Sequence, residues 1–200
     1  MTKSSSLPLK RKRGHWRVDG EDEKLPSMVA GWRCVRVSRD ACAASNTWRV
    51  TGTGTWGEAT CSRTVDARAY MSNFSFHNAK NENDDSMKVT ATISLHNCPE
   101  SDTSWHCTHT RESLNLHVWG EGLYLQCSSY DGHGNWQFVC PLHQNHSYTI
   151  FLYMLKSKAG VTVFDGSRLF EQQCQFRPIE ITQAWKFSVE CKVGTVSFRV

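Results

Sequence analysis

The stretch that decides the fold covers residues 114–128 and reads Leu114-Asn-Leu-His-Val-Trp-Gly-Glu-Gly-Leu-Tyr-Leu-Gln-Cys-Ser128. Apolar and polar residues alternate on both sides of its central Gly-Glu-Gly. Alternation with a period of two is typical of a strand that buries one face. We therefore expect strands at 113–119 and 123–128, each with an apolar face toward a core and a polar face outside.

The outward faces of these two strands carry side chains that can hydrogen-bond to a sugar or stack against one. His117 and Trp119 point outward from the first strand, and Gln126 and Ser128 from the second. Trp136 follows a turn-like segment and begins the next extended run. Imidazole, amide and hydroxyl groups exchange hydrogen bonds with hydroxyls, and an indole offers a flat apolar face. These residues indicate a carbohydrate-binding sheet.

Short alternating runs fill the rest of the chain from residue 87 onward. The other expected strands are 87–95, 103–109, 136–140, 148–155, 160–164, 169–176, 179–184, 186–193 and 195–200. Turn residues separate these runs, and none has the spacing of an amphipathic helix. The sequence therefore predicts an all-β fold, an antiparallel two-sheet β-sandwich. We find no internal repeat that would divide it into two sites.

This organisation resembles the galectin carbohydrate-recognition domain. The opening stretch is similar to the galectin strands that read His-x-Asn-Pro-Arg and Val-x-Asn, and Trp136 to the start of Trp-Gly-x-Glu. Residues 87–93, 161–166 and 187–193 resemble an early strand, a late hairpin and the closing strand of that family. The resemblance implies a galectin-like jelly roll over 61–200.

The resemblance also implies roles for single residues. His117 matches the galectin His that hydrogen-bonds the axial hydroxyl of galactose, and Trp136 matches the Trp that stacks on the sugar. Trp119 and Ser128 stand where the family has Asn, and Glu121 stands where it has Arg. Each lost polar contact costs about 1–3 kcal/mol. We therefore expect a divergent site and do not expect ordinary β-galactoside recognition.

Two functions follow from this face. The first is a carbohydrate-binding module whose partner is a glycan or glycoprotein. Its expected site residues are His117, Trp119, Glu121, Gln126, Ser128 and Trp136. The alternative is a protein-interaction domain that kept the galectin fold, lost the sugar, and uses the same exposed aromatics as interface anchors. An oligomer is compatible with either function.

Catalytic and metal-binding patterns are weak. We find no Gly-rich phosphate loop, no nucleophile elbow and no recognisable carboxylate pair, so we expect a non-enzyme without a cofactor. His96, Cys98, Cys107 and His109 are zinc-ligand types, but their spacing matches no common zinc module. We therefore predict no metal site.

The N-terminal residues differ in composition from the rest. Six basic residues precede the first acid, so of a net charge of +4 the remainder carries −2. We expect a disordered basic tail over 1–28, no nucleic-acid site on the domain and no membrane insertion. Lys10–Arg13 resembles a nuclear-import signal, with a solubilising arm as the alternative. The expected location is cytoplasmic or nuclear, although the galectin resemblance implies export without a signal peptide.

The sequence supports two further predictions, one for residues 29–60 and one for the cysteines. We expect 29–60 to add β structure, either as an extra hairpin or as an additional outer strand. Trp56-Gly57-Glu58 echoes the galectin Trp-Gly motif, but its upstream position favours coincidence. Nine cysteines are scattered along a chain that shows no signal peptide, so we expect them to be mostly reduced.

Overall fold

The computed structural model describes residues 9–12, 15–18, 27–29, 32–35, 37–39, 47–65, 69–79, 86–98, 112–129, 136–154, 158–175 and 184–199. All regular elements in these ranges are strands. They are β1 (Leu9–Lys12), β2 (His15–Val18), β3 (Ser27–Val29), β4 (Trp32–Val35), β5 (Val37–Arg39), β6 (Thr47–Thr51), β7 (Thr60–Val65), β8 (Ala69–His77), β9 (Thr90–Cys98), β10 (Glu112–Trp119), β11 (Gly122–Ser129), β12 (Gln137–Pro141), β13 (Ser147–Met154), β14 (Lys158–Phe164), β15 (Leu169–Gln175), β16 (Ala184–Val193) and β17 (Thr195–Arg199). The described residues include no helix that could span a bilayer.

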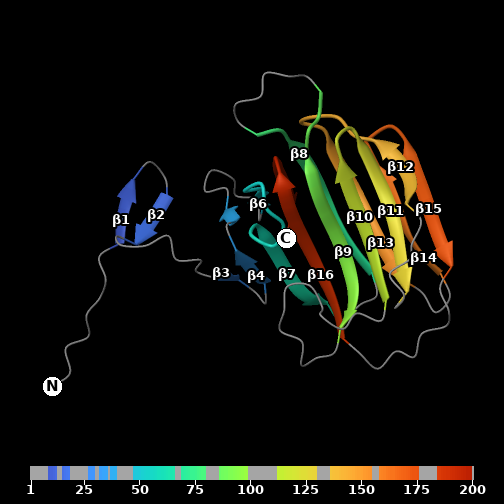
Figure 1. Ribbon diagram of the computed structural model, residues 1–200, viewed down its shortest axis with the longest axis horizontal. Helices are drawn as coiled ribbons and strands as arrows, with labels where there is room; N and C mark the ends of the chain where they lie inside the picture. The colour runs from blue at the N-terminus through green and yellow to red at the C-terminus, as the bar shows by residue number, and fades with distance from the viewer. Residues whose placement is uncertain are drawn as a thin grey trace.

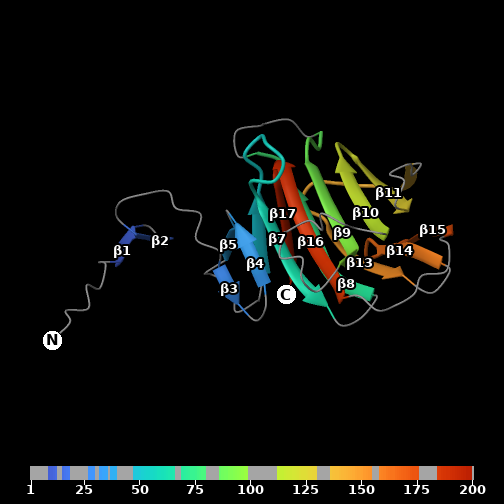
Figure 2. The same cartoon turned by 60° about the horizontal axis from the view of Figure 1, so that its bottom comes forward.

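The strands from β3 to β17 form two stacked antiparallel sheets (Figures 1 and 2). One has eight strands in the order β12-β11-β10-β9-β16-β7-β4-β3, and the other has seven in the order β15-β14-β13-β8-β17-β6-β5. The predicted all-β, two-sheet sandwich is confirmed. The expected strands 113–119 and 123–128 correspond to β10 and β11, whereas 103–109 lies outside the described residues.

Alternating side chains build the core between the two sheets. On β10, Leu114, Leu116 and Val118 are almost fully buried, while the residues between them face outward. Similar alternation on the other long strands supplies the apolar layer, in which removal of side-chain area from water is the main stabilising term. The opposite face of the eight-stranded sheet is left to polar side chains, and the candidate site lies there.

Residues 27–51, most of which belong to the segment 29–60, contribute outer strands to both sheets. β3 and β4 extend the eight-stranded sheet beyond β7, while β5 and β6 extend the seven-stranded sheet beyond β17. Trp32 of β4 is fully buried and contacts Phe187 and Phe198, with ring centres 5.8 and 5.4 Å away. Of the two arrangements expected for this segment, the structure has the additional outer strands. Trp32 and Trp48 complete the core at this edge.

The predicted disordered tail, residues 1–28, contains a short described hairpin. β1 and β2 pair with each other as a separate two-stranded sheet, with Lys12 opposite His15. Within the predicted disordered tail the structure therefore has β1, β2 and the start of β3, and for the other residues of 1–28 disorder stays a prediction.

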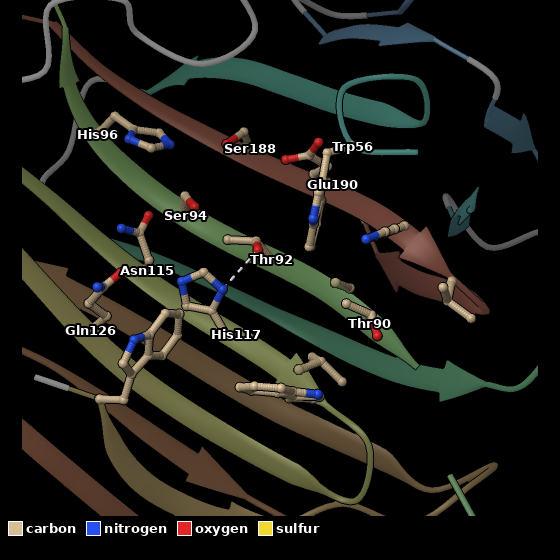
Figure 3. Close-up of a pocket in the computed structure, with 16 residues that line it drawn as sticks. Trp56, Thr90, Thr92, Ser94, His96, Asn115, His117, Gln126, Ser188 and Glu190 are labelled. Atoms are coloured by element: carbon tan, nitrogen blue, oxygen red, sulfur yellow. Dashed lines mark hydrogen bonds between the residues drawn. The ribbon is translucent and has the colours of Figure 1, made fainter. Parts of the chain in front are cut away.

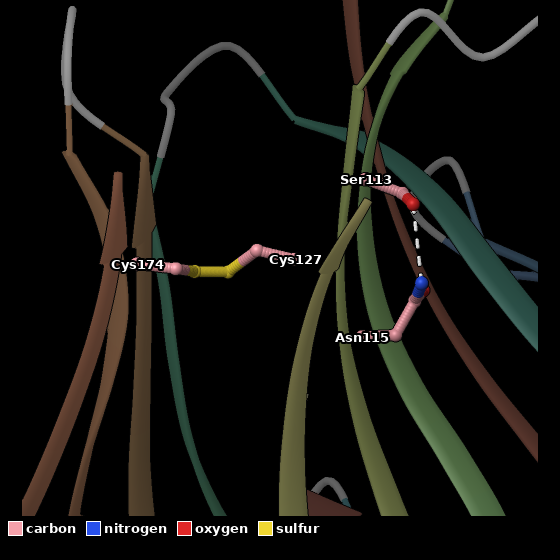
Figure 4. The surroundings of a disulfide bond; sticks show 4 residues. All are labelled: Ser113, Asn115, Cys127 and Cys174. Atoms are coloured by element: carbon pink, nitrogen blue, oxygen red, sulfur yellow. Dashed lines mark hydrogen bonds between the residues drawn. A yellow bond between two sulfur atoms is a disulfide. The ribbon is translucent and has the colours of Figure 1, made fainter. Parts of the chain in front are cut away.

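Two disulfides correct the expectation that the cysteines are mostly reduced. Cys34 on β4 pairs with Cys61 on β7, and Cys127 on β11 pairs with Cys174 on β15. The second bond joins the two sheets (Figure 4). The expectation was wrong for these four of the nine cysteines, because pairing depends on strand order, which spacing along the chain does not reveal. Cys140 is a free, buried thiol, and burial raises its pKa to about 12.

The turn between β16 and β17 requires glycine. Gly194 has a φ of +81°, and a Cβ there would lie 2.6 Å from the His77 carbonyl oxygen and 2.9 Å from Val89 Cγ2. We expect Gly194→Ala to lower the free energy of unfolding by about 2–3 kcal/mol, because it adds a clash to the strained backbone. Gly54→Ala is the control, since φ is +93° there with no atom within 4 Å. Equal losses in urea denaturation of both variants would contradict the role of the clash.

Candidate functional site

A groove of about 690 Å³ lies on the outer face of the eight-stranded sheet, over β11, β10, β9 and β16. Figure 3 shows its side chains rising from these neighbouring strands. The volume falls within the range of about 300–1,000 Å³ that is typical of small-molecule sites. The groove is therefore large enough to hold a ligand of several rings.

Strand register arranges the floor of the groove in two polar rows that cross the strands. In the first polar row, His117 lies opposite Thr92, which lies opposite Glu190. The second polar row runs parallel to the first. Its members are Gln126, Asn115, Ser94 and Ser188. Directly opposed residues share a face of the sheet, so both rows present their side chains to the same space.

His117 lies at the start of the first polar row, where its ring contacts the indole of Trp136. Thr92 Oγ1 and His117 Nδ1 are 3.1 Å apart and hydrogen-bonded, while Nε2 is buried. The ring centres of His117 and Trp136 are 3.7 Å apart. Burial lowers the pKa of His117 to about 4, and the Gln126 side chain offsets part of this effect. At neutral pH the imidazole is uncharged, with one nitrogen that donates and one that accepts.

Three exposed tryptophans border the polar floor. Trp119 is 73% exposed at the end of β10, Trp136 is 48% exposed just before β12, and Trp56 is 42% exposed in the loop between β6 and β7. Large apolar side chains that remain exposed around a concave surface commonly mark a binding site. The groove thus combines flat apolar rims with a floor of hydrogen-bonding groups.

The structure brings together four of the six predicted site residues. His117, Trp119, Gln126 and Trp136 all line the groove. Glu121 does not line it, since this exposed residue belongs to the β10–β11 turn, where its carbonyl accepts a hydrogen bond from the Leu142 N–H. The Ser128 backbone pairs with Ser113 on β10, and its side chain is outside the described set.

Several residues of the groove were missing from the sequence prediction. They include Thr92, Ser94, Asn115, Ser188, Glu190 and Trp56. The outward positions on β9 were recognisable from alternation, but alternation does not show that β9 and β16 are neighbours of β10. The similarity of Trp56-Gly57-Glu58 to the galectin Trp-Gly motif was attributed to coincidence, whereas Trp56 lines this same groove.

Glu190 hydrogen-bonds the loop that carries Trp56 to the sheet. Its buried carboxylate accepts a hydrogen bond from the Gly57 N–H. Burial raises the pKa of Glu190, and the Gly57 hydrogen bond offsets part of that rise. Lys192 Nζ lies 5.8 Å from the centre of the Trp56 ring, within cation–π range. Two neighbouring residues of the loop, Trp56 and Gly57, therefore contact β16, through Lys192 and Glu190 respectively.

The described residues gather no three His, Cys, Asp or Glu side chains that could hold a metal ion. Of the cysteines and histidines considered for zinc, Cys107 and His109 lie outside these residues. The groove's own described lining is dominated by hydroxyl, amide and indole groups. Its chemistry is suited to hydrogen bonding and stacking with a neutral polar ligand.

Known proteins match this chain in fold and not in sequence. No family model and no curated protein matches it. Among solved structures, Bacillus licheniformis β-glucanase matches with a TM-score of 0.52 and 10% identity, covering 88% of this chain and 93% of that one. Basic winged bean lectin, solved with Tn-antigen, matches at 0.50 with 8% identity, covering 84% and 91%.

A third solved structure extends the comparison. Xylan β-1,4-xylosidase from Bacillus halodurans C-125 matches with a TM-score of 0.50 and 8% identity over 90% of this chain, and this chain spans 38% of that one. At these identities the likeness shows the fold alone. The protein is an antiparallel β-sandwich with a polar, tryptophan-bordered groove on one sheet.

Proposed function

We propose that this protein binds glycans in the groove, as a galectin-like module with a divergent site. The observation that carries the proposal is the pairing of two rows of hydrogen-bonding side chains with exposed indoles. A sugar presents hydroxyls around its ring edge and apolar C–H groups on its faces. Rows of hydroxyl, amide and imidazole groups match the edge, and the indoles match the faces.

The contact between His117 and Trp136 supports the galectin-like part of the proposal. These two residues lie 19 positions apart in the sequence, and their rings are in contact in the structure. The Nε2 atom of His117 is buried, and the Gln126 side chain is a hydrogen-bonding neighbour of the same ring. The imidazole, the Gln126 amide and the indole therefore lie together, and such a group can hydrogen-bond a sugar hydroxyl and stack against the ring.

Binding is better supported than hydrolysis. Glycoside hydrolases generally use two carboxyl groups on either side of the scissile bond. In the described lining of this groove, Glu190 supplies the carboxylate, and that group is already engaged by the Gly57 N–H. We therefore assign the groove to recognition and not to cleavage.

A printed glycan array tests the proposal. We expect the purified protein to bind a subset of the printed glycans, and Trp136→Ala to reduce those signals at least tenfold. Removal of an aromatic anchor typically costs about 2 kcal/mol or more. Phe164→Ala is the matched control, because Phe164 is an exposed aromatic on the seven-stranded sheet, away from the groove. A folded protein that binds no printed glycan would overturn the proposal.

A variant of the polar floor, tested on the same array, distinguishes glycan binding from the alternative function of a protein-interaction domain. A protein-interaction domain would use the exposed indoles, above all Trp119, without needing the polar floor. Asn115→Ala removes a floor amide and leaves all three indoles in place. Under the glycan proposal, we expect this variant also to lose binding, because a hydrogen-bonding partner of a sugar hydroxyl is removed.

A further inference from the structure

Trp56 closes the groove at the end opposite Trp136. Figure 3 places Trp56 beside Glu190, on the far side of Thr92 from His117. Trp136 contacts His117 at the other end of the same polar row. The two indoles therefore flank the polar floor from opposite sides of the groove.

The loop that carries Trp56 is held firmly along β16 and its turn. The Gly52 N–H donates to the Gly194 carbonyl and the Gly54 N–H to the Lys192 carbonyl, both at 2.8 Å. The Thr53 hydroxyl donates to Glu58 within the loop, at 2.8 Å. Together with the Gly57–Glu190 hydrogen bond, these contacts fix the backbone on both sides of Trp56. A fixed backbone presents the indole with little ordering cost on binding.

The floor between the two ends is too long for one sugar. Trp136 contacts His117 on β10 and Trp56 lies beside Glu190 on β16 (Figure 3), so the two ends are two strand spacings apart, or about 9.5 Å. A single pyranose ring stacked on Trp136 cannot reach Trp56 across that span, whereas a linear chain of about three rings can. The parallel polar rows offer hydrogen-bonding groups along the whole path.

We propose that Trp56 forms a second stacking subsite, so that the groove selects linear glycans of three or more sugars. The inference rests on the proposed glycan-binding function and deepens it. In this arrangement one ring stacks at Trp136, the middle of the chain lies over Thr92 and Ser94, and a further ring stacks at Trp56. Lys192, beside the Trp56 ring, steadies the indole and leaves a groove-facing surface for the ligand.

A length series of glycans tests this subsite. The probes are linear glycans of one to five sugars, including oligomers of N-acetyllactosamine and of β-linked glucose, printed on one array. We expect Trp56→Ala to lose at least tenfold signal on glycans of three or more sugars and to match the unmodified protein on mono- and disaccharides. Trp136→Ala, by contrast, should lose signal at every length.

A second variant separates stacking from folding. Trp56→Phe keeps a flat ring and should restore most of the long-glycan signal, whereas Trp56→Leu keeps apolar bulk without a ring and should not. The inference is overturned if Trp56→Ala changes all lengths equally or changes none. Silence of the unmodified protein on the whole array would instead refute the proposed function, and this inference with it.

Discussion

The stability advantage of this protein over its His117→Gln variant is expected to shrink by about 3 kcal/mol when the pH falls from 7 to 4. Burial lowers the pKa of His117 from 6.5 to about 4. Between these values the unfolded chain binds a proton that the folded protein does not. The stabilisation is therefore complete above pH 6.5 and is lost as the pH falls through about 4, at about 1.4 kcal/mol per unit.

Urea denaturation of both proteins at several pH values measures this effect. Other titrating groups are present in both, so their contributions largely cancel in the difference. Thr92→Val gives a further comparison, because it removes the hydrogen bond to Nδ1 and leaves the imidazole in place. A stability difference that stays constant from pH 7 to pH 4 would show that His117 is not held neutral by burial.

Replacing both Cys127 and Cys174 by Ala should lower the free energy of unfolding by about 4 kcal/mol. The disulfide closes a segment with a sequence separation of 47 residues and joins β11 to β15. A cross-link of that span removes a large part of the conformational entropy of the unfolded chain. Urea denaturation without reductant measures the loss.

Cys140→Ala is the control for the disulfide variant. Cys140 is a buried free thiol, so this change removes a sulfur from the core without breaking a cross-link. We expect a loss of about 1–2 kcal/mol, since only a small cavity forms. If the double replacement costs no more than the control, the Cys127–Cys174 bond does not contribute to stability.

The sequence predicted best those structural features that depend on a single strand. The alternation around His117 predicted β10 and β11 to within a residue at each end, together with their polar face. The resemblance assigned His117 and Trp136 to one sugar site, and the two rings do meet. Period-two alternation depends only on local sequence, and for this reason these features were predictable.

Features that depend on strand order were not predictable in the same way. Ser188 and Glu190 belong to the groove because β16 lies beside β9, although many residues separate them in the chain. Trp56 joins the groove because its loop is held along β16. The Cys127–Cys174 bond likewise needs the two sheets to meet at β11 and β15. Such non-local contacts leave no periodic signal in one sequence.

The Glu121 prediction shows a limit of motif alignment. The resemblance placed Glu121 at a ligand-binding position, but here it follows Gly120, which has a φ of +56° and turns the chain out of β10. The residue is exposed in that turn and lies outside the groove. A matching position in a motif therefore does not ensure a matching direction of the side chain.

Indole NMR of the labelled protein tests the central claim most directly. The chain has eight tryptophans, of which Trp56, Trp119 and Trp136 line the groove, whereas Trp32 is buried in the core. Titration with the glycan that gives the strongest array signal should shift the three groove indole N–H resonances and leave that of Trp32 unchanged. Saturable binding that leaves all three groove resonances in place would contradict the assignment of this groove as the glycan site.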